Sequence, residues 1–270
     1  MTALYKKELR AFLSSTIGTV VLGVFLLIGG LFHWVFPGQW NLLSNGIAEM
    51  NAFFLFTPWV LMFLIPAITM RSIPEERSQG TLELLMTHPL DARRIILAKF
   101  FAGLTLVSIA LIPTLIGYAI LHELGNPPGN IDSGAVVAGY LGLVLLGGAF
   151  VATGLAASAR TESQIVAFLT TALACLIMYY GPSALGSYDL FGQWDHAIQW
   201  CAMETHFRSI GTGVVVVSDL LWFCAYMAIA LAIAQFQIQP ERLGHLTCCS
   251  IMGPGSIGTW SSTPSAPPSC

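Results

Sequence analysis

The sequence predicts an all-α polytopic membrane protein with six transmembrane helices, and two observations support this fold class. The first is composition: 55% of the 270 residues are hydrophobic and only 9% are charged, whereas soluble domains carry roughly 25% charge. The second is a set of six apolar runs, each near the roughly 20 residues that a helix needs to cross a bilayer. The runs cover about residues 16–36, 53–69, 95–121, 135–157, 164–181 and 220–238.

Charged residues are almost absent from these runs. Only Lys99, near the start of the third run, places a Lys, Arg, Asp or Glu inside one of them. A charge at the centre of a transmembrane helix costs roughly 2.5–3.5 kcal/mol on insertion scales, so this avoidance favours real spans. The runs could also be core helices of a large soluble protein, but the chain has too little polar sequence to cover six of them.

The distribution of Lys and Arg predicts the orientation of the chain. If the N-terminus lies in the cytoplasm, the inner segments hold ten of the eleven basic residues and the outer segments hold only Arg208. Such an excess is typical of cytoplasmic loops, so both termini are expected in the cytoplasm. No cleavable signal peptide is expected, because the first apolar run is longer than the core of a typical signal.

Three segments outside the apolar runs have a distinct residue pattern or composition. In residues 2–15, apolar and basic residues fall on opposite helical sides, which predicts an N-terminal helix lying in the inner interface; an ordinary basic flank is the alternative. Between the fifth and sixth runs, Trp194, Ile198, Cys201 and Thr205 trace one helical face and predict one or two short outer helices. Residues 241–270 are rich in Ser, Thr, Gly and Pro and are expected to be disordered.

The second run holds two prolines, Pro58 and Pro66, and therefore predicts a kinked or irregular helix. The fourth run holds many small residues, and close packing against neighbouring helices accounts for them.

The segment between the second and third runs concentrates charge. Nine of the 25 charged residues of the chain lie between Arg71 and Lys99. Ser72 and Glu75 fit a capping box at the start of a short helix, and a second short helix follows. We expect a cytoplasmic helical hairpin with acidic residues on its first arm and apolar residues at its tip, a shape suited to a groove on another protein. A solvated loop is the alternative.

This segment also carries a resemblance to a known family. Glu75-Glu-Arg-Ser-Gln-Gly-Thr-Leu-Glu-Leu-Leu-Met-Thr-His-Pro89, followed by Ile-Ile-Leu-Ala-Lys99, resembles the E-E-(R/K)-x-x-G-T-L-E-L-L-x-(T/S)-x-P…(G/A)-K motif of type-2 ABC transporter permeases. In that family the motif forms the coupling region that rests in a groove on the ATPase subunit. The resemblance implies that the ATPase-coupling residues are Glu75, Glu76, Gly80, Thr81, Leu82, Glu83, Leu85, Met86 and Pro89.

Further stretches are similar to the gliding-motility-associated permease of Bacteroidetes-type bacteria. They are Thr16–Gly18, Leu31–Phe36, Pro66–Ser72, Leu124–Pro127, Glu162–Phe168 and His206–Ser209. The resemblance implies an ABC-2 type permease domain over residues 1–240, located in the bacterial inner membrane as part of an ATP-driven exporter linked to gliding motility. The partners it implies are an ABC ATPase subunit, a second copy or a homologous permease, the lipid bilayer and an auxiliary gliding-motility membrane subunit.

The sequence contains no G-x-x-x-x-G-K-[ST] motif, and Lys occurs only at positions 6, 7 and 99. The chain therefore has no P-loop with which to hold ATP, so it is not expected to be an enzyme, and ATP hydrolysis is expected in a partner chain. No Cys/His spacing resembles a zinc site, Glu204 and His206 alone are a weak metal signal, and no basic cluster remains for nucleic acid. We expect no cofactor and no metal.

Two other functions remain open. A non-transporting anchor or scaffold of the gliding or secretion apparatus is disfavoured by the coupling motif, since an anchor needs no ATPase groove. An ion channel or secondary carrier would need charged or polar residues within its spans, and only His33, near the outer end of the first run, is of this kind. The transported substrate is not predicted; an apolar lining would fit a lipid, a hydrophobic small molecule or a polymer.

Overall fold

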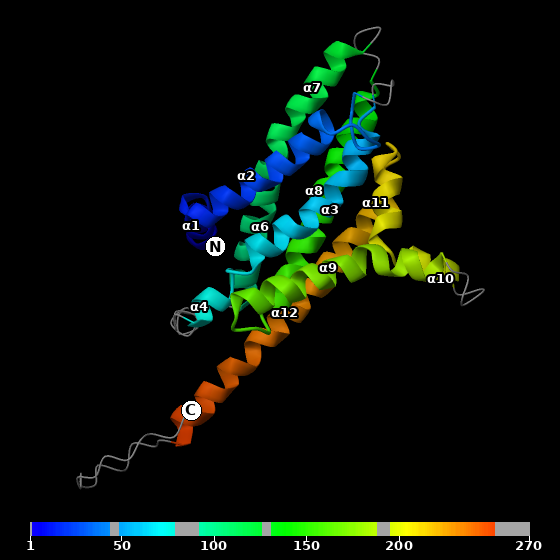
Figure 1. Ribbon diagram of the computed structural model, residues 1–270. Coiled ribbons are helices and arrows are strands. Elements are labelled where there is room, and N and C mark those ends of the chain that lie inside the picture. Colours follow the sequence, from blue (N-terminus) through cyan, green and yellow to red (C-terminus); the bar gives the residue numbers. More distant parts are fainter. Residues whose placement is uncertain (1, 44–48, 79–91, 126–130, 188–194, 252–270) are drawn as a thin grey trace, which may run out of the picture.

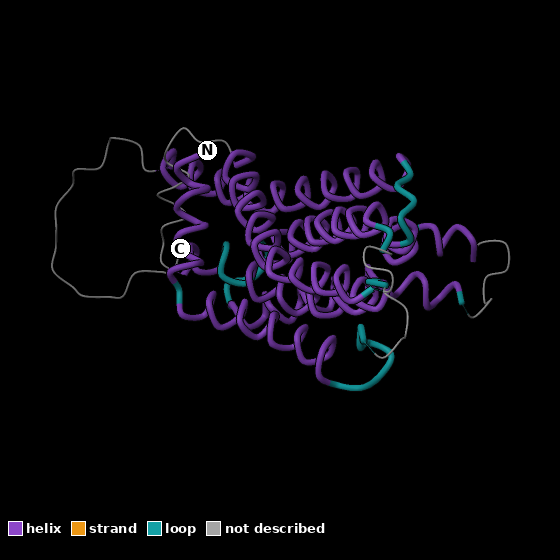
Figure 2. The backbone as a smooth tube through the Cα atoms, turned by 90° about the horizontal axis from the view of Figure 1, so that it is seen from above, coloured by secondary structure: helices purple, strands orange, loops and turns teal. Residues whose placement is uncertain are grey.

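The computed structural model describes residues 2–43, 49–78, 92–125, 131–187 and 195–251. All regular elements in these ranges are helices (Figures 1 and 2), which confirms the all-α prediction. Six helical segments are long and apolar enough to cross a membrane, as predicted. They are Thr16–Val35, Asn51–Ser78, Arg93–Leu124, Ser133–Ser158, Gln164–Gly186 and Val217–Gln237.

The helix α8 (Ser133–Ser158) lies at the centre of the bundle (Figure 1). It packs against α3 (Asn51–Thr69), α6 (Ala92–Leu111), α9 (Gln164–Gly186), α11 (Met203–Gly211) and α12 (Val217–Ile251). Its small residues permit these contacts: a Cβ atom built on Gly147 would lie 2.8 Å from Cγ1 of Val107 on α6. The prediction that the small residues of the fourth run serve close helix packing is therefore confirmed.

Two of the spans change their helical geometry along their length. The first consists of α2 (Thr16–Gly30) followed by the π-helical turn η1 (Leu31–Val35). In the third, the 3₁₀ turn η2 (Ile112–Thr114) separates α6 from α7 (Leu115–Leu124). Pro113 lies within η2, and its missing N–H and its ring are incompatible with an undisturbed α-helix.

The helix α3, by contrast, continues from Asn51 to Thr69 with Pro58 and Pro66 inside it. The sequence predicts an irregular helix at these prolines, but the secondary structure is uninterrupted. Both prolines are buried against the rest of the bundle, an environment in which neighbouring groups can compensate for the lost backbone hydrogen bonds.

The predicted N-terminal helix is present as α1 (Thr2–Ser14), which packs against α6 and α2. Its apolar side chains Leu9 and Phe12 pack against the core, while Lys6 and Arg10 are exposed. The amphipathic character expected from the sequence therefore matches the way this helix is packed.

The segment between the fifth and sixth spans contains the two short helices α10 (Asp195–Trp200) and α11. The turn at Cys201 and Ala202 separates them, so the single predicted face is split between two helices, and Trp194 lies outside the described residues. The backbone of α12 continues to Ile251. Residues 241–251, for which the sequence predicts disorder, therefore belong to this helix, and residues 252–270 lie outside the described residues.

Candidate functional site

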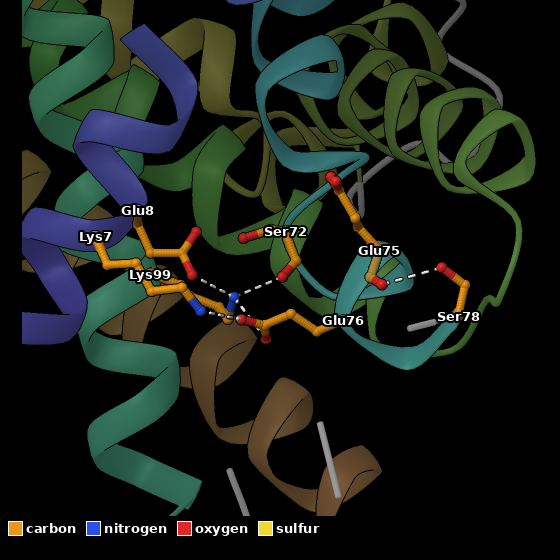
Figure 3. Close-up of polar contacts among 7 residues, drawn as sticks. All are labelled: Lys7, Glu8, Ser72, Glu75, Glu76, Ser78 and Lys99. Carbon is orange, nitrogen blue, oxygen red and sulfur yellow. Dashed lines mark hydrogen bonds and ion pairs between the residues drawn. The ribbon is translucent and has the colours of Figure 1, made fainter. Parts of the chain in front are cut away.

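The only charged residue of the apolar runs, Lys99, has an almost fully buried side chain that is 1% exposed. Its ammonium donates hydrogen bonds to Glu8 Oε1 at 2.8 Å and to the carbonyl oxygen of Ser72 at 2.6 Å (Figure 3). It also forms an ion pair with Glu76 Oε2 at 2.9 Å. Two of the three N–H groups of the ammonium therefore have hydrogen-bond acceptors, and the nearby Glu76 carboxylate balances its charge.

We call Lys7, Glu8, Ser72, Glu76 and Lys99 the Lys99 cluster. A buried charge is tolerated when it is both paired and hydrogen-bonded, and this cluster meets both conditions for Lys99. The Glu8 and Glu76 side chains are only 20% and 12% exposed. Lys7 lies at the rim, 3.8 Å from Glu76 and 61% exposed, so its screened contribution is small.

The Lys99 cluster joins three parts of the chain that are distant in sequence. Glu8 belongs to α1, Lys99 to α6, and Ser72 and Glu76 to the turn after α3 and the short helix α4 (Pro74–Ser78). All three parts meet at the Lys99 ammonium. The cluster therefore ties the start of the charged segment to two other helices.

Two arginines add further links at the same end of the bundle. Arg71 Nη1 donates a hydrogen bond to Ser15 Oγ at 3.1 Å, between α1 and α2. Arg77 Nη2 donates to the carbonyl oxygen of Ala159 at 3.2 Å, directly after α8. Basic residues that the charge distribution predicts for one side of the membrane therefore gather at one end of the helices.

The structure describes two of the nine residues that the motif assigns to ATPase coupling. Glu76 points to Lys99, so its carboxylate is engaged within the chain, whereas the carboxylate of Glu75 is turned away from Lys99 (Figure 3). The other seven lie outside the described residues: Gly80, Thr81, Leu82, Glu83, Leu85, Met86 and Pro89.

The predicted capping box is wrong in its register. The helix α4 begins at Pro74, a residue suited to the first helical position, and not directly after Ser72. Instead of capping, Ser72 offers its backbone carbonyl to Lys99. Sequence reasoning missed the part played by Lys99, although a lone charge within an apolar run is a signal of a paired and functional residue.

Glu204 and His206, the weak metal signal of the sequence, have other partners in the structure. His206 Nδ1 lies 2.9 Å from Asp219 Oδ1, and its Nε2 lies 2.8 Å from the carbonyl oxygen of Trp200. Through these two contacts the ring links α11 to α10 and α12. Glu204 accepts a hydrogen bond from Ser183 Oγ on α9. The described residues contain no group of three or more side chains arranged to hold a metal ion.

The apolar helices define a multi-pass membrane protein. Residues 2–237 match the family model of the ABC-2 family transporter protein. This match covers most of the chain, so the protein belongs to that family. Among curated proteins, none matches the chain significantly.

Membership of this family defines the protein as a membrane permease of a type-2 ABC transporter. It is a transport subunit, generally without catalysis of its own, and its ATPase resides in a partner chain.

Proposed function

We propose that the chain is the permease of an ATP-driven exporter in the bacterial inner membrane, and that the ATPase acts on residues 72–89. The observation that supports this proposal is the Lys99 cluster, which connects the start of that segment to α6 and α1. Residues 1–240 form the permease domain. Two copies, or this chain and a homologous permease, pair with two ATPase subunits.

The Lys99 cluster provides a route by which movement passes from the ATPase to the spans. When the ATPase displaces α4, the ion pair of Glu76 with Lys99 transmits the displacement to α6, and the hydrogen bond of Lys99 to Glu8 carries it to α1. Removing one partner of a buried ion pair costs about 3–5 kcal/mol. Helices joined in this way move together more readily than they separate.

The proposed orientation places both termini and the charged segment in the cytoplasm. It is supported by the contacts of Lys7, Arg71, Arg77 and Lys99 at one end of the bundle. In this orientation α1 lies at the cytoplasmic interface of the membrane. The helix α4 is then the first helix of a hairpin that reaches the groove of the ATPase.

The similarity of several stretches to gliding-motility permeases supports a link to gliding motility, with an auxiliary membrane subunit as a further partner. The test begins with a pull-down of the protein solubilised from its native membrane, with identification of the partners and an assay of ATP hydrolysis. We expect an ABC ATPase in the eluate together with ATP hydrolysis. An eluate that contains large envelope proteins but no ATPase would contradict the transporter function and favour the hypothesis of a non-transporting anchor.

The double variant Glu83→Ala, Leu85→Asp tests where the ATPase binds. It removes one charged and one apolar contact of the proposed hairpin, so we expect normal membrane insertion and loss of the ATPase from the eluate. The matched control is Glu162→Ala, which removes an exposed carboxylate from the link between α8 and α9. Wild-type amounts of ATPase with the double variant would contradict the assignment of residues 72–89 as the coupling segment.

A further inference from the structure

A cavity of about 260 Å³ lies beside the Lys99 cluster, between α1, α3, α4, α6 and α8. We call it the inner cavity. One of its walls is apolar and includes Phe12, Ile68, Leu106, Val151 and Leu155. Such a wall favours carbon over water as its occupant.

Another part of the lining, the polar wall, holds four charged side chains. They are Glu8, Arg71, Glu75 and Lys99. Glu8 and Lys99 are joined to each other in the Lys99 cluster. Arg71 and Glu75 remain, one cation and one anion that line the same cavity.

These two charges lack complete partners. Arg71 donates from Nη1 to Ser15, but its buried Nε has no hydrogen-bond partner. The Glu75 carboxylate has no ion pair or hydrogen bond with any side chain or backbone group of the described residues, and Figure 3 shows it turned away from the Lys99 cluster. A buried donor without a partner is costly, so a ligand with an acceptor for Arg71 Nε would be stabilised here. A cation on the same ligand would pair with the half-buried Glu75 carboxylate.

We propose that the inner cavity binds the headgroup of a zwitterionic phospholipid bearing a primary ammonium. Its phosphate accepts hydrogen bonds from Arg71, because the guanidinium geometry matches phosphate oxygens. Its ammonium lies against the Glu75 carboxylate, and its glycerol and acyl carbons cover the apolar wall. A phosphate and an ammonium together carry no net charge, which matches the two cations and two anions of the polar wall.

The position of the inner cavity favours a membrane lipid over a soluble zwitterion. Arg71 follows the C-terminal end of α3, and α1, which covers the cavity, is amphipathic. Both features place the cavity at the depth of the bilayer interface, where headgroups lie. A soluble headgroup has no carbon chain with which to cover the apolar wall, and an anionic lipid has no cation for Glu75.

Native mass spectrometry of the delipidated full chain, with the subunits that co-purify with it, tests this site. The probes are phosphatidylethanolamine, phosphatidylglycerol and soluble glycerophosphoethanolamine. We expect one phosphatidylethanolamine per chain, bound about tenfold more tightly than phosphatidylglycerol, a ratio equivalent to about 1.4 kcal/mol. Arg71→Gln and Glu75→Gln should each weaken phosphatidylethanolamine binding about tenfold.

The matched controls are Arg77→Gln and Glu162→Gln, which remove the same charges outside the inner cavity and should leave lipid binding unchanged. Equal affinity for both lipids, or unchanged affinity in the Arg71 and Glu75 variants, would overturn the site. If soluble glycerophosphoethanolamine binds as tightly as phosphatidylethanolamine, the proposal that the occupant is a membrane lipid is overturned. If Arg71→Gln fails to fold, Glu75→Gln decides the question, because the Glu75 carboxylate has no partner among the described residues whose loss could unfold the chain.

Discussion

Replacement of Lys99 by methionine tests the energetic role of the Lys99 cluster. Methionine has a similar length and fills the buried space, but it leaves the Glu8 and Glu76 carboxylates without their shared cation. Removal of one partner from a buried ion pair costs about 3–5 kcal/mol. Because Glu8 and Glu76 are 20% and 12% exposed, water screens them in part, and we expect a loss of about 3 kcal/mol, at the lower end of that range.

The free energy of unfolding, measured in lipid micelles by steric trapping, gives the result directly. The matched control is Lys6→Met, which removes an exposed ammonium from α1 and should change the free energy by less than about 0.5 kcal/mol. The double variant Lys99→Met, Glu76→Gln should cost less than the sum of the two single variants, since the single change at Lys99 leaves Glu76 unpaired. A loss under about 1 kcal/mol for Lys99→Met, the range of an exposed pair, or strict additivity would refute this reasoning.

Three further predictions concern helix packing. Gly103→Val should lower the free energy of unfolding by about 1–3 kcal/mol, because a Cβ atom on Gly103 would already lie 2.8 Å from Val151. An unchanged free energy of unfolding would contradict this close contact between α6 and α8. His206→Leu should destabilise the protein by about 1.5–3 kcal/mol, because it leaves Asp219 buried without its partner, and a second change, Asp219→Asn, should recover part of the loss. If Asp219→Asn recovers none of the lost stability, the pairing of His206 with Asp219 is contradicted. Tyr226→Phe removes a hydroxyl contact to α8 at 2.9 Å and should cost about 0.5–1.5 kcal/mol in the same unfolding assay; no measurable loss would contradict that hydrogen bond.

The six spans could be predicted from the sequence because the bilayer imposes a length and a polarity on every helix that crosses it. The central position of α8 follows less directly, but its many small residues indicated close packing. Interruptions within the spans were harder to predict. Pro58 and Pro66 lie within the uninterrupted α3, whereas Pro113 lies in the 3₁₀ turn η2, since tertiary contacts decide whether a proline disturbs its helix.

The sequence predicts a functional role for the charged segment, and that role stays a prediction, but the sequence does not predict the contacts within the segment. Lys99 was visible as the one charge within an apolar run, yet its partner Glu8 is 91 residues away in the sequence. No local pattern encodes such a pairing, because it depends on how α1 folds back against α6. The inner cavity escaped prediction for the same reason: its lining comes from five separate helices, α1, α3, α4, α6 and α8.

The central claim is that an ATPase binds residues 72–89, and site-specific photo-cross-linking in native membranes tests it most directly. The cross-linking residue replaces Leu85 in one variant and Val214, in the loop after α11, in the matched control. The account places position 214 on the other side of the membrane, so it predicts that position 85 cross-links to an ABC ATPase and that position 214 does not. Cross-links from position 85 only to envelope proteins or lipid, or an ATPase adduct at position 214, would contradict it.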